Sequence, residues 1–325
     1  LKQIPCPEAL TLWLHLNNEE GGIPLTKTLE VQTDAAEGQY QFKHLSFQEG
    51  LFSQYLILQA QEALEPGHEP MAIWASDEAA SQFLCDPFMN NTCRISAGIL
   101  GSLLARRRPN WDFSAAPLSA TGKRALWLLA NDDLHELNLR KNRVGEDNDD
   151  TNEGLAKLIN VATNLAVLRL GDNSLGNLAD EDSGWRRQQI SRALSSSVSI
   201  VELDISRNDL RPAGVAVMCM ALRSLKTLVK LDISFNWPGR TRELPELLAT
   251  HPALTSIGIV EEPPNVAWQR VAYLDSRAKE RIGRTLLDRA VPTLGFIHCD
   301  AFTLDEHTTA LNWKSTLEAD AVLLA

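Results

Sequence analysis

Cysteine and long apolar runs are both scarce in this chain of 325 residues. The cysteines are odd in number and widely spaced, and none forms a C-x-x-C pair. They are Cys6, Cys85, Cys93, Cys219 and Cys299. This pattern gives neither a disulfide framework nor a zinc site, so we interpret them as reduced thiols of a cytoplasmic protein. The longest apolar run, 97–105, is far shorter than the ~20 residues that a membrane span needs, so no membrane partner is expected.

Positive charge is also in deficit. The chain has 31 lysines and arginines against 42 aspartates and glutamates, which gives a formal net charge of −11. Because phosphate groups would be repelled, this balance argues against a nucleic-acid or anionic-membrane partner and favours a basic or amphipathic one.

Catalytic signatures are missing as well. H-E-x-x-H, G-x-S-x-G and G-x-G-x-x-G do not occur, so we expect no catalytic residue and no enzymatic activity. The acidic run 146–153 lacks the glycine and the final glutamate of an EF-hand loop. His298, Cys299, Asp300 and His307 are the densest group of potential ligands, but they straddle a degenerate repeat. We therefore expect no metal site.

One pattern, L-x-x-L-x-L-x-x-N-x-L, recurs in the second half of the chain. Four copies start at Leu134, Leu165, Ile200 and Leu228. A fifth at Leu254 lacks the asparagine, and a degenerate sixth starts at Leu294. The starts lie 31, 35, 28, 26 and 40 residues apart, which leaves room for a helix in every unit.

Each part of the pattern has a physical meaning. The alternating leucines place two apolar side chains on one face of a short strand. The asparagine amide both donates to and accepts from backbone groups that the following bend leaves unpaired. We therefore predict a buried ladder of stacked amides. Its members are Asn142, Asn173, Asn208 and Asn236.

Helical spacing of apolar residues fills the gaps at 155–162, 190–194, 215–222 and 244–248, and Pro212 suits the first turn of the third helix. A unit of strand, turn and helix resembles the ribonuclease-inhibitor type of leucine-rich repeat. The resemblance implies a curved α/β solenoid with parallel strands on the concave side and helices outside.

The x positions of such strands point away from the core, and we expect them to bind a protein or another macromolecule. They are charged and of mixed sign. They are Glu136, Asn138, Arg140, Arg169, Glu202, Asp204, Ser206, Lys230, Asp232 and Ser234. The alternative interpretation is that they form only the solvated face of a sheet. Reversing the charges of Arg140 and Arg169 is expected to weaken partner binding without unfolding the protein.

The first half predicts a hairpin that leads into a helix. Strands are expected at 29–32 and 39–43, and a helix at about 47–64 with Ser46 and Glu49 as a capping box. This order is typical of a winged-helix fold. Further helices are expected at 71–84 and 86–108, the second ending in an arginine cluster that suits a helix C-terminus.

The segment YQFKHLSFQE at 40–49 resembles the F-x-H-x-x-F-Q-E-F signature of NACHT-type NLR proteins, the nucleotide-binding, leucine-rich-repeat receptors. The matching residues are Phe42, His44, Phe47, Gln48 and Glu49, whereas Gly50 stands where the family has an aromatic residue. The resemblance implies a winged-helix segment and following helix at 1–60, a helical linker domain at 61–125 and a repeat domain of five to six repeats at 126–325.

In this family the histidine of the motif contacts the phosphate of bound ADP, a role that would fall to His44. The chain itself has no phosphate-binding loop, because Gly122-Lys123-Arg124 lacks the upstream glycine and the magnesium-binding hydroxyl. We expect no cofactor in this chain. ADP or ATP would need an upstream nucleotide-binding core, and the chain is expected to be a piece of a longer protein.

The resemblance implies a signalling protein of the innate-immunity kind. Its repeats would bind a ligand, or fold back on the NACHT module and restrain it. Two alternatives stay open, a GTPase-activating protein built on leucine-rich repeats and a plain protein-binding scaffold.

Overall fold

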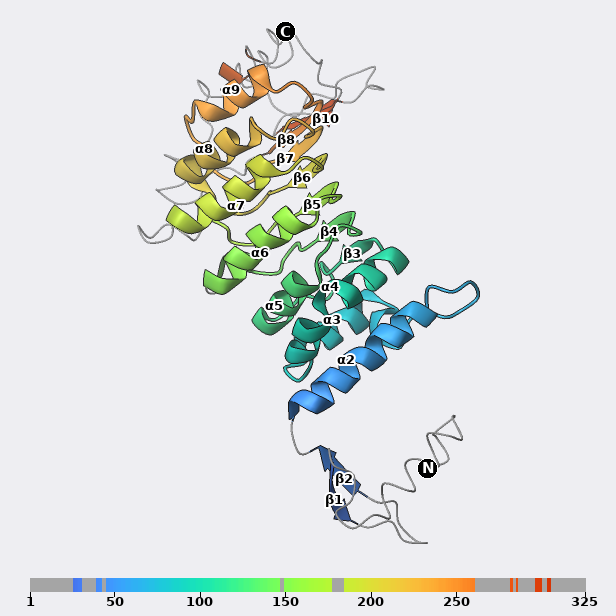
Figure 1. Ribbon diagram of the computed structural model, residues 1–325. Coiled ribbons are helices and arrows are strands. Elements are labelled where there is room, and N and C mark those ends of the chain that lie inside the picture. Colours follow the sequence, from blue (N-terminus) through green and yellow to red (C-terminus); the bar gives the residue numbers. More distant parts are fainter. Residues whose placement is uncertain are drawn as a thin grey trace.

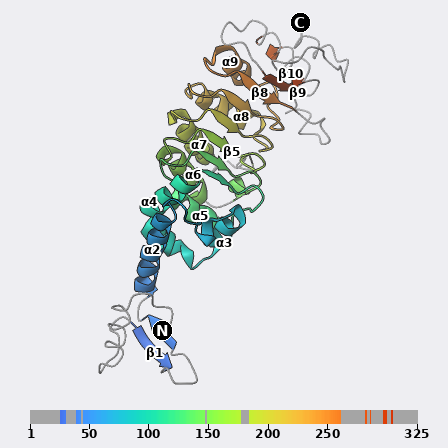
Figure 2. The ribbon, with the colours of Figure 1, turned by 90° about the vertical axis from the view of Figure 1, so that its right-hand side faces the viewer.

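The protein is mixed α/β, with a parallel sheet as its central element. A computed structural model (Figure 1) describes residues 26–30, 39–42, 45–146, 149–176, 184–260, 281–282, 285, 296–299 and 303–304. Along the chain, a two-stranded hairpin precedes a group of helices, and the sheet follows. Helices line one side of this sheet, as both views show (Figures 1 and 2).

The strands of the sheet are arranged in chain order. They are β3 (Asn110–Asp112), β4 (Glu136–Asn138), β5 (Val167–Arg169), β6 (Glu202–Asp204), β7 (Lys230–Asp232), β8 (Ser256–Ile259), β9 (Phe296–Cys299) and β10 (Thr303–Leu304). Strands β3 to β9 pair in parallel, and β10 is antiparallel to β9. The predicted strands of the first five repeats are therefore confirmed, in one continuous register.

A helix follows each of the strands β3 to β7, because parallel neighbours need a crossover connection. The helices are α5 (Ala120–Leu129), α6 (Asp149–Val161), α7 (Gly184–Ser196), α8 (Arg211–Leu222) and α9 (Glu243–Thr250). Consecutive helices pack against each other. Pro212 lies in the first turn of α8, as predicted, where its missing N–H leaves no unpaired acceptor.

The repeated leucines form the core between sheet and helices. Leu134, Leu137 and Leu139 have no exposed surface, and the equivalent residues of the next units are buried in the same way. Burying one leucine contributes roughly 1.5–3 kcal/mol, so the repeat pattern accounts for much of the folding free energy.

The helices upstream of the sheet agree with the expectations in part. They are α2 (Leu45–Glu62), the short η1 (Ala72–Trp74), α3 (Asp77–Cys85) and α4 (Met89–Arg107). The helix predicted at 71–84 is two pieces, because Ser76 caps α3 by accepting from the Ala79 N–H. Helix α2 starts at Leu45, so Ser46 lies inside it and the predicted capping box is wrong. Helix α4 ends in the arginine cluster, as predicted.

The predicted hairpin is confirmed, since β1 (Thr26–Glu30) pairs antiparallel with β2 (Gln39–Phe42). Its first strand begins a few residues before the predicted start at 29. No helix in the described part of the chain is long and apolar enough to cross a membrane.

Strand β3 and helix α5 form a unit that the sequence pattern did not reveal. Trp111 is in register with Leu137 on β4, and Trp111, Phe113 and Leu118 are all buried. These residues have the spacing of the apolar positions of the repeat, with Ala116 in place of the asparagine. The parallel sheet thus begins upstream of residue 126, the boundary expected from the sequence.

Candidate functional site

A ladder of asparagines fixes the turns that follow the strands. Asn173 Oδ1 accepts from the N–H of Asn142 (3.0 Å) and of Val144 (3.2 Å). Asn208 and Asn236 repeat these bonds with the unit before each of them. The spacing of the turns is therefore set by the same side chain in each unit.

The amide nitrogens of the ladder donate to backbone carbonyls. Asn173 Nδ2, for example, lies 2.7 Å from the carbonyl oxygen of Leu139 and 3.2 Å from that of Gly171. All four asparagines are buried, with at most 2% of their surface exposed. Because both amide ends are bonded, the ladder offsets the cost of burying polar groups. The predicted ladder of satisfied amides is confirmed.

Opposite the helices, the sheet presents a surface that we call the open face. Its side chains come from alternate strand positions, and the register aligns them in rows. One row holds Asn110, Glu136, Val167, Glu202, Lys230 and Ser256. The next holds Asp112, Asn138, Arg169, Asp204, Asp232 and Gly258. The structure therefore brings the predicted surface residues together on one face.

Most charges of the open face pair with each other. Arg169 bridges Glu136 on one neighbouring strand and Glu202 on the other, the latter at 3.0 Å. Burial lowers the pKa of Arg169, but the hydrogen bond and charge of Glu136, with those of Glu202, outweigh burial and raise it. Lys230 Nζ lies 3.6 Å from the second oxygen of Glu202.

A second pair spans three strands. Arg140 lies just past β4, and its Nη1 is 2.7 Å from Asp204 Oδ2 on β6. Gly171, which follows the intervening strand β5, leaves the path open. A Cβ at Gly171 would lie 2.9 Å from that same oxygen. Ser206 Oγ donates to the other oxygen, Asp204 Oδ1, at 2.6 Å, so this carboxylate is held on both sides.

These pairs change the expectation for charge reversal. Acidic residues at Arg140 and Arg169 would face Asp204, Glu136 and Glu202, so the double reversal would destabilise the fold as well as alter the surface. Asn138 and Asp204, which were predicted to contact a partner, are more than nine-tenths buried. Their main contacts are within the sheet.

Asp232 differs from the other carboxylates of the open face. Its Oδ1 accepts from the Ser234 N–H at 2.9 Å, and it lies beside Gly258, whose added Cβ would be 2.8 Å from Oδ1. Within the described residues no lysine or arginine pairs with it. Asp232 is half-buried, so one part of its side chain still faces solvent.

Asp112, at the first edge of the open face, was not predicted from the sequence. Burial raises the pKa of Asp112, but hydrogen bonds from Ser114 and Asn138 and the charge of Arg169 lower it below its ordinary value. The signal was present in the sequence, since Asp112 lies between Trp111 and Phe113 as Asn138 lies between two leucines. Gly171 and Gly258 were also missed, because a glycine at an x position adds no side chain to the surface.

Most of the remaining candidate positions fall outside the part of the chain that the structure describes. His44, Asp300 and His307 lie outside the described residues, and so does part of the acidic run 146–153. His298 and Cys299 are on β9. No group of three or more potential metal ligands occurs among the residues whose positions are described.

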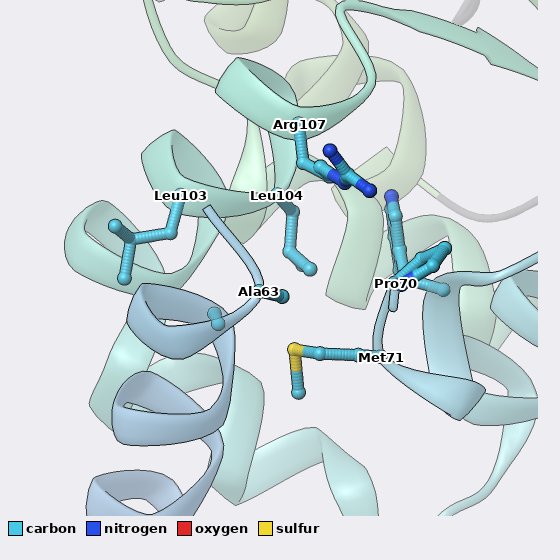
Figure 3. Close-up of a pocket in the computed structure, with 8 residues that line it drawn as sticks. Ala63, Pro70, Met71, Leu103, Leu104 and Arg107 are labelled. Atoms are coloured by element: carbon cyan, nitrogen blue, oxygen red, sulfur yellow. The ribbon is translucent and has the colours of Figure 1, made fainter. Parts of the chain in front are cut away.

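A small apolar pocket lies between α2, η1 and α4 (Figure 3). Met71 points into it toward Ala63, with Leu103, Leu104 and Arg107 around it. Its volume of about 10 Å³ is at the lower limit for a single water molecule. The pocket therefore leaves no room for a small-molecule ligand.

No known family model matches the chain, and no curated protein sequence matches it significantly. The open face is therefore interpreted from its own chemistry.

Proposed function

We propose that this chain is a leucine-rich-repeat protein of the ribonuclease-inhibitor type, coiled as a solenoid, whose open face binds a protein. The asparagine ladder is the observation that carries the proposal. It links strand, turn and helix units of unequal length in one register, which is the arrangement that such repeats need.

The open face supports binding because it is broad and chemically mixed. Five neighbouring strands, β4 to β8, contribute charged, hydroxyl and glycine positions, and the helices lie on the other side. Charged groups that are already fixed by ion pairs lose little side-chain entropy when a partner docks, so they suit recognition. We propose no catalytic role for these residues.

For the whole protein we propose an NLR-like regulatory or recognition role in the cytoplasm. The motif at 40–49, the hairpin before α2 and the order of hairpin, helices and sheet support this. On this proposal, ADP or ATP would be bound by an upstream nucleotide-binding core, near His44. The sheet would either bind a ligand or fold back on that core.

A photo-cross-linking amino acid tests the binding proposal. Placed at Lys230, which is exposed on the open face, it should capture a specific protein partner in cells. At Lys157 on α6, which is also exposed, it serves as the matched control and should not capture the same protein. If the same proteins are cross-linked at both positions, or if none is cross-linked at Lys230, the open face is not the binding surface.

The GTPase-activating alternative has its own assay. The purified protein is mixed with small GTPases, and the rate of GTP hydrolysis is measured. Acceleration would replace the proposal with this alternative.

A further inference from the structure

We propose that Asp232 is the anchor point for an arginine side chain of the protein partner. This inference rests on the proposed function of the open face and names the chemistry of what binds there. The partner is a protein segment with an exposed arginine.

The chain itself supplies the template for such a contact. The guanidinium of Arg140 reaches Asp204 Oδ2 at 2.7 Å, and Gly171, which follows the intervening strand β5, lies beside that oxygen. Asp204 is held ready by Ser206, whose N–H and hydroxyl both donate to Oδ1 (2.9 and 2.6 Å). One carboxylate oxygen is thus fixed by the sheet while the other binds the guanidinium.

Asp232 repeats part of this arrangement on the next strand, although the Ser234 hydroxyl accepts from the Val260 N–H (3.0 Å). The sequence Leu-Asp-Ile-Ser occurs at 203–206 and again at 231–234. The Ser234 N–H holds Asp232 Oδ1 at 2.9 Å, as the Ser206 N–H holds Asp204. A glycine again lies beside the carboxylate, here Gly258 on β8, the strand on the far side from Asp204, although the oxygen nearest to it is Oδ1 and not Oδ2. In the described part of the chain, no bond reaches Asp232 Oδ2.

The cations of the open face are committed elsewhere. Arg140 forms an ion pair with Asp204, and Arg169 forms ion pairs with Glu136 and Glu202. Lys230, two residues before Asp232 on the same strand, lies within 3.6 Å of Glu202 instead. The two rows of the open face between β3 and β8 carry five carboxylates, namely Asp112, Glu136, Glu202, Asp204 and Asp232, against two cations, Arg169 and Lys230, to which Arg140 just past β4 adds a third. Its unmatched charge is therefore negative.

The register adds a reason for a cation at this point. Asp204 and Asp232 are paired positions on neighbouring strands, and like charges opposite each other destabilise a sheet. Arg140 relieves this repulsion from the Asp204 side only. A guanidinium at Asp232 would relieve it from the other side. Arginine suits the position better than lysine because its guanidinium is more weakly hydrated than an ammonium, and the pair that serves as the template is itself made by an arginine.

The experiment uses a fluorescent peptide with three arginines separated by Gly-Ser pairs, and measures its affinity for the chain by fluorescence anisotropy. The neutral control peptide has citrulline at each arginine. Asp232→Asn keeps an oxygen for the Ser234 N–H and removes the charge. Asp132→Asn, in the exposed loop before β4, makes the same change in net charge away from the open face. Unfolding by urea confirms that both variants are folded.

We expect Asp232→Asn to weaken arginine-peptide binding by about tenfold, as for a close charge pair, and Asp132→Asn to leave it unchanged. The citrulline peptide should bind weakly to all forms. Equal weakening by the two variants would mean diffuse attraction by net charge, and no weakening by Asp232→Asn would mean that the peptide binds elsewhere. Each result would overturn the assignment.

Cross-linking at Lys230, repeated in the Asp232→Asn variant, distinguishes a failure of this inference from a failure of the proposed function. If Asp232→Asn leaves that capture unchanged, the open face still binds a protein and only the arginine anchor is wrong. If no partner is captured at Lys230, both the proposed function and the anchor are rejected.

Discussion

The buried ammonium of Lys123 donates to the carbonyl oxygen of Asn142 over 2.6 Å. In the following units a backbone N–H makes this bond, as from Gly145 to Asn173 (2.8 Å) and from Gly176 to Asn208 (2.7 Å). In the first unit the corresponding N–H, that of Ser119, donates to Cys85 Sγ instead. A side chain of α5 thus replaces a backbone group where the ladder meets the upstream helices.

Replacing Lys123 should therefore destabilise the start of the sheet. We expect Lys123→Met to lower the free energy of unfolding by about 1–3 kcal/mol, because the Asn142 carbonyl loses a buried donor. Urea unfolding measures the change. Lys157→Met removes an exposed lysine on α6 and should stay within about 0.5 kcal/mol of the parent protein. An equal loss for both would contradict the role of Lys123.

Substitution of an asparagine in the middle of the ladder should destabilise the protein most. Asn208 Oδ1 accepts from two N–H groups and its Nδ2 donates to the Leu170 carbonyl. Asn208→Ala leaves these groups buried without partners, and we expect a loss of about 3 kcal/mol or more in thermal or urea unfolding. Asn164→Ala breaks one exposed bond to the Asp132 carbonyl and should cost less than about 1 kcal/mol. A small loss at Asn208 would show that the turns hold without the ladder.

Two glycines should respond in opposite ways to alanine. At Gly171 the new Cβ would lie 2.9 Å from Asp204 Oδ2 and 3.0 Å from Ser206 Oγ, so Gly171→Ala should displace the Arg140 pair and destabilise the protein by about 1 kcal/mol. At Gly98, inside α4, nothing lies within 4 Å, and Gly98→Ala should stabilise it by about 0.5–1 kcal/mol. Melting temperatures that move in the same direction would contradict this contrast.

Two cysteines should be inert in the folded protein. Burial raises the pKa of Cys93 and of Cys219 to about 12, and the thiolate is the reactive form. Iodoacetamide at pH 8 should leave both unmodified, whereas the half-buried Cys85 reacts. Peptide mass spectrometry distinguishes them, and in guanidinium chloride all should react. Fast alkylation of Cys93 in the native protein would contradict its burial.

Low pH should lower the stability of the fold in part through the protonation of two aspartates. Hydrogen bonding from Ser102, with Arg106, lowers the pKa of Asp133, and the pKa of Asp112 is lowered as well. A carboxyl group with a lowered folded-state pKa stabilises the protein above its unfolded pKa of about 3.9, and this is lost as the pH falls through the folded value. The double variant Asp112→Asn, Asp133→Asn should therefore lose less stability between pH 5 and pH 2. Parallel unfolding curves for both proteins would contradict this.

Regular elements of the fold were predictable because their signals are periodic. Leucine alternation, the recurring asparagine and helical spacing each predicted a strand, a turn or a helix that the structure contains. The unit at β3 was not predicted, because Trp111, Phe113 and Ala116 stand where the pattern expects leucines and an asparagine. In α4, the apolar Ile99 is 59% exposed whereas its neighbour Leu100 is fully buried, since helical spacing alone does not show which face of a helix meets its neighbours.

The sequence alone determined the units and their order. Each unit is specified by apolar residues and a turn-closing asparagine that lie within about ten residues of one another in the chain, so the pattern can be recognised locally. Only the tertiary structure decided which charges of the open face remain available. Arg140 and Asp204 form an ion pair although they are 64 residues apart in the chain, and a side chain at Gly171 would crowd the oxygen that Arg140 contacts. Such pairing depends on strand register, which forms when the units pack and which no local pattern encodes.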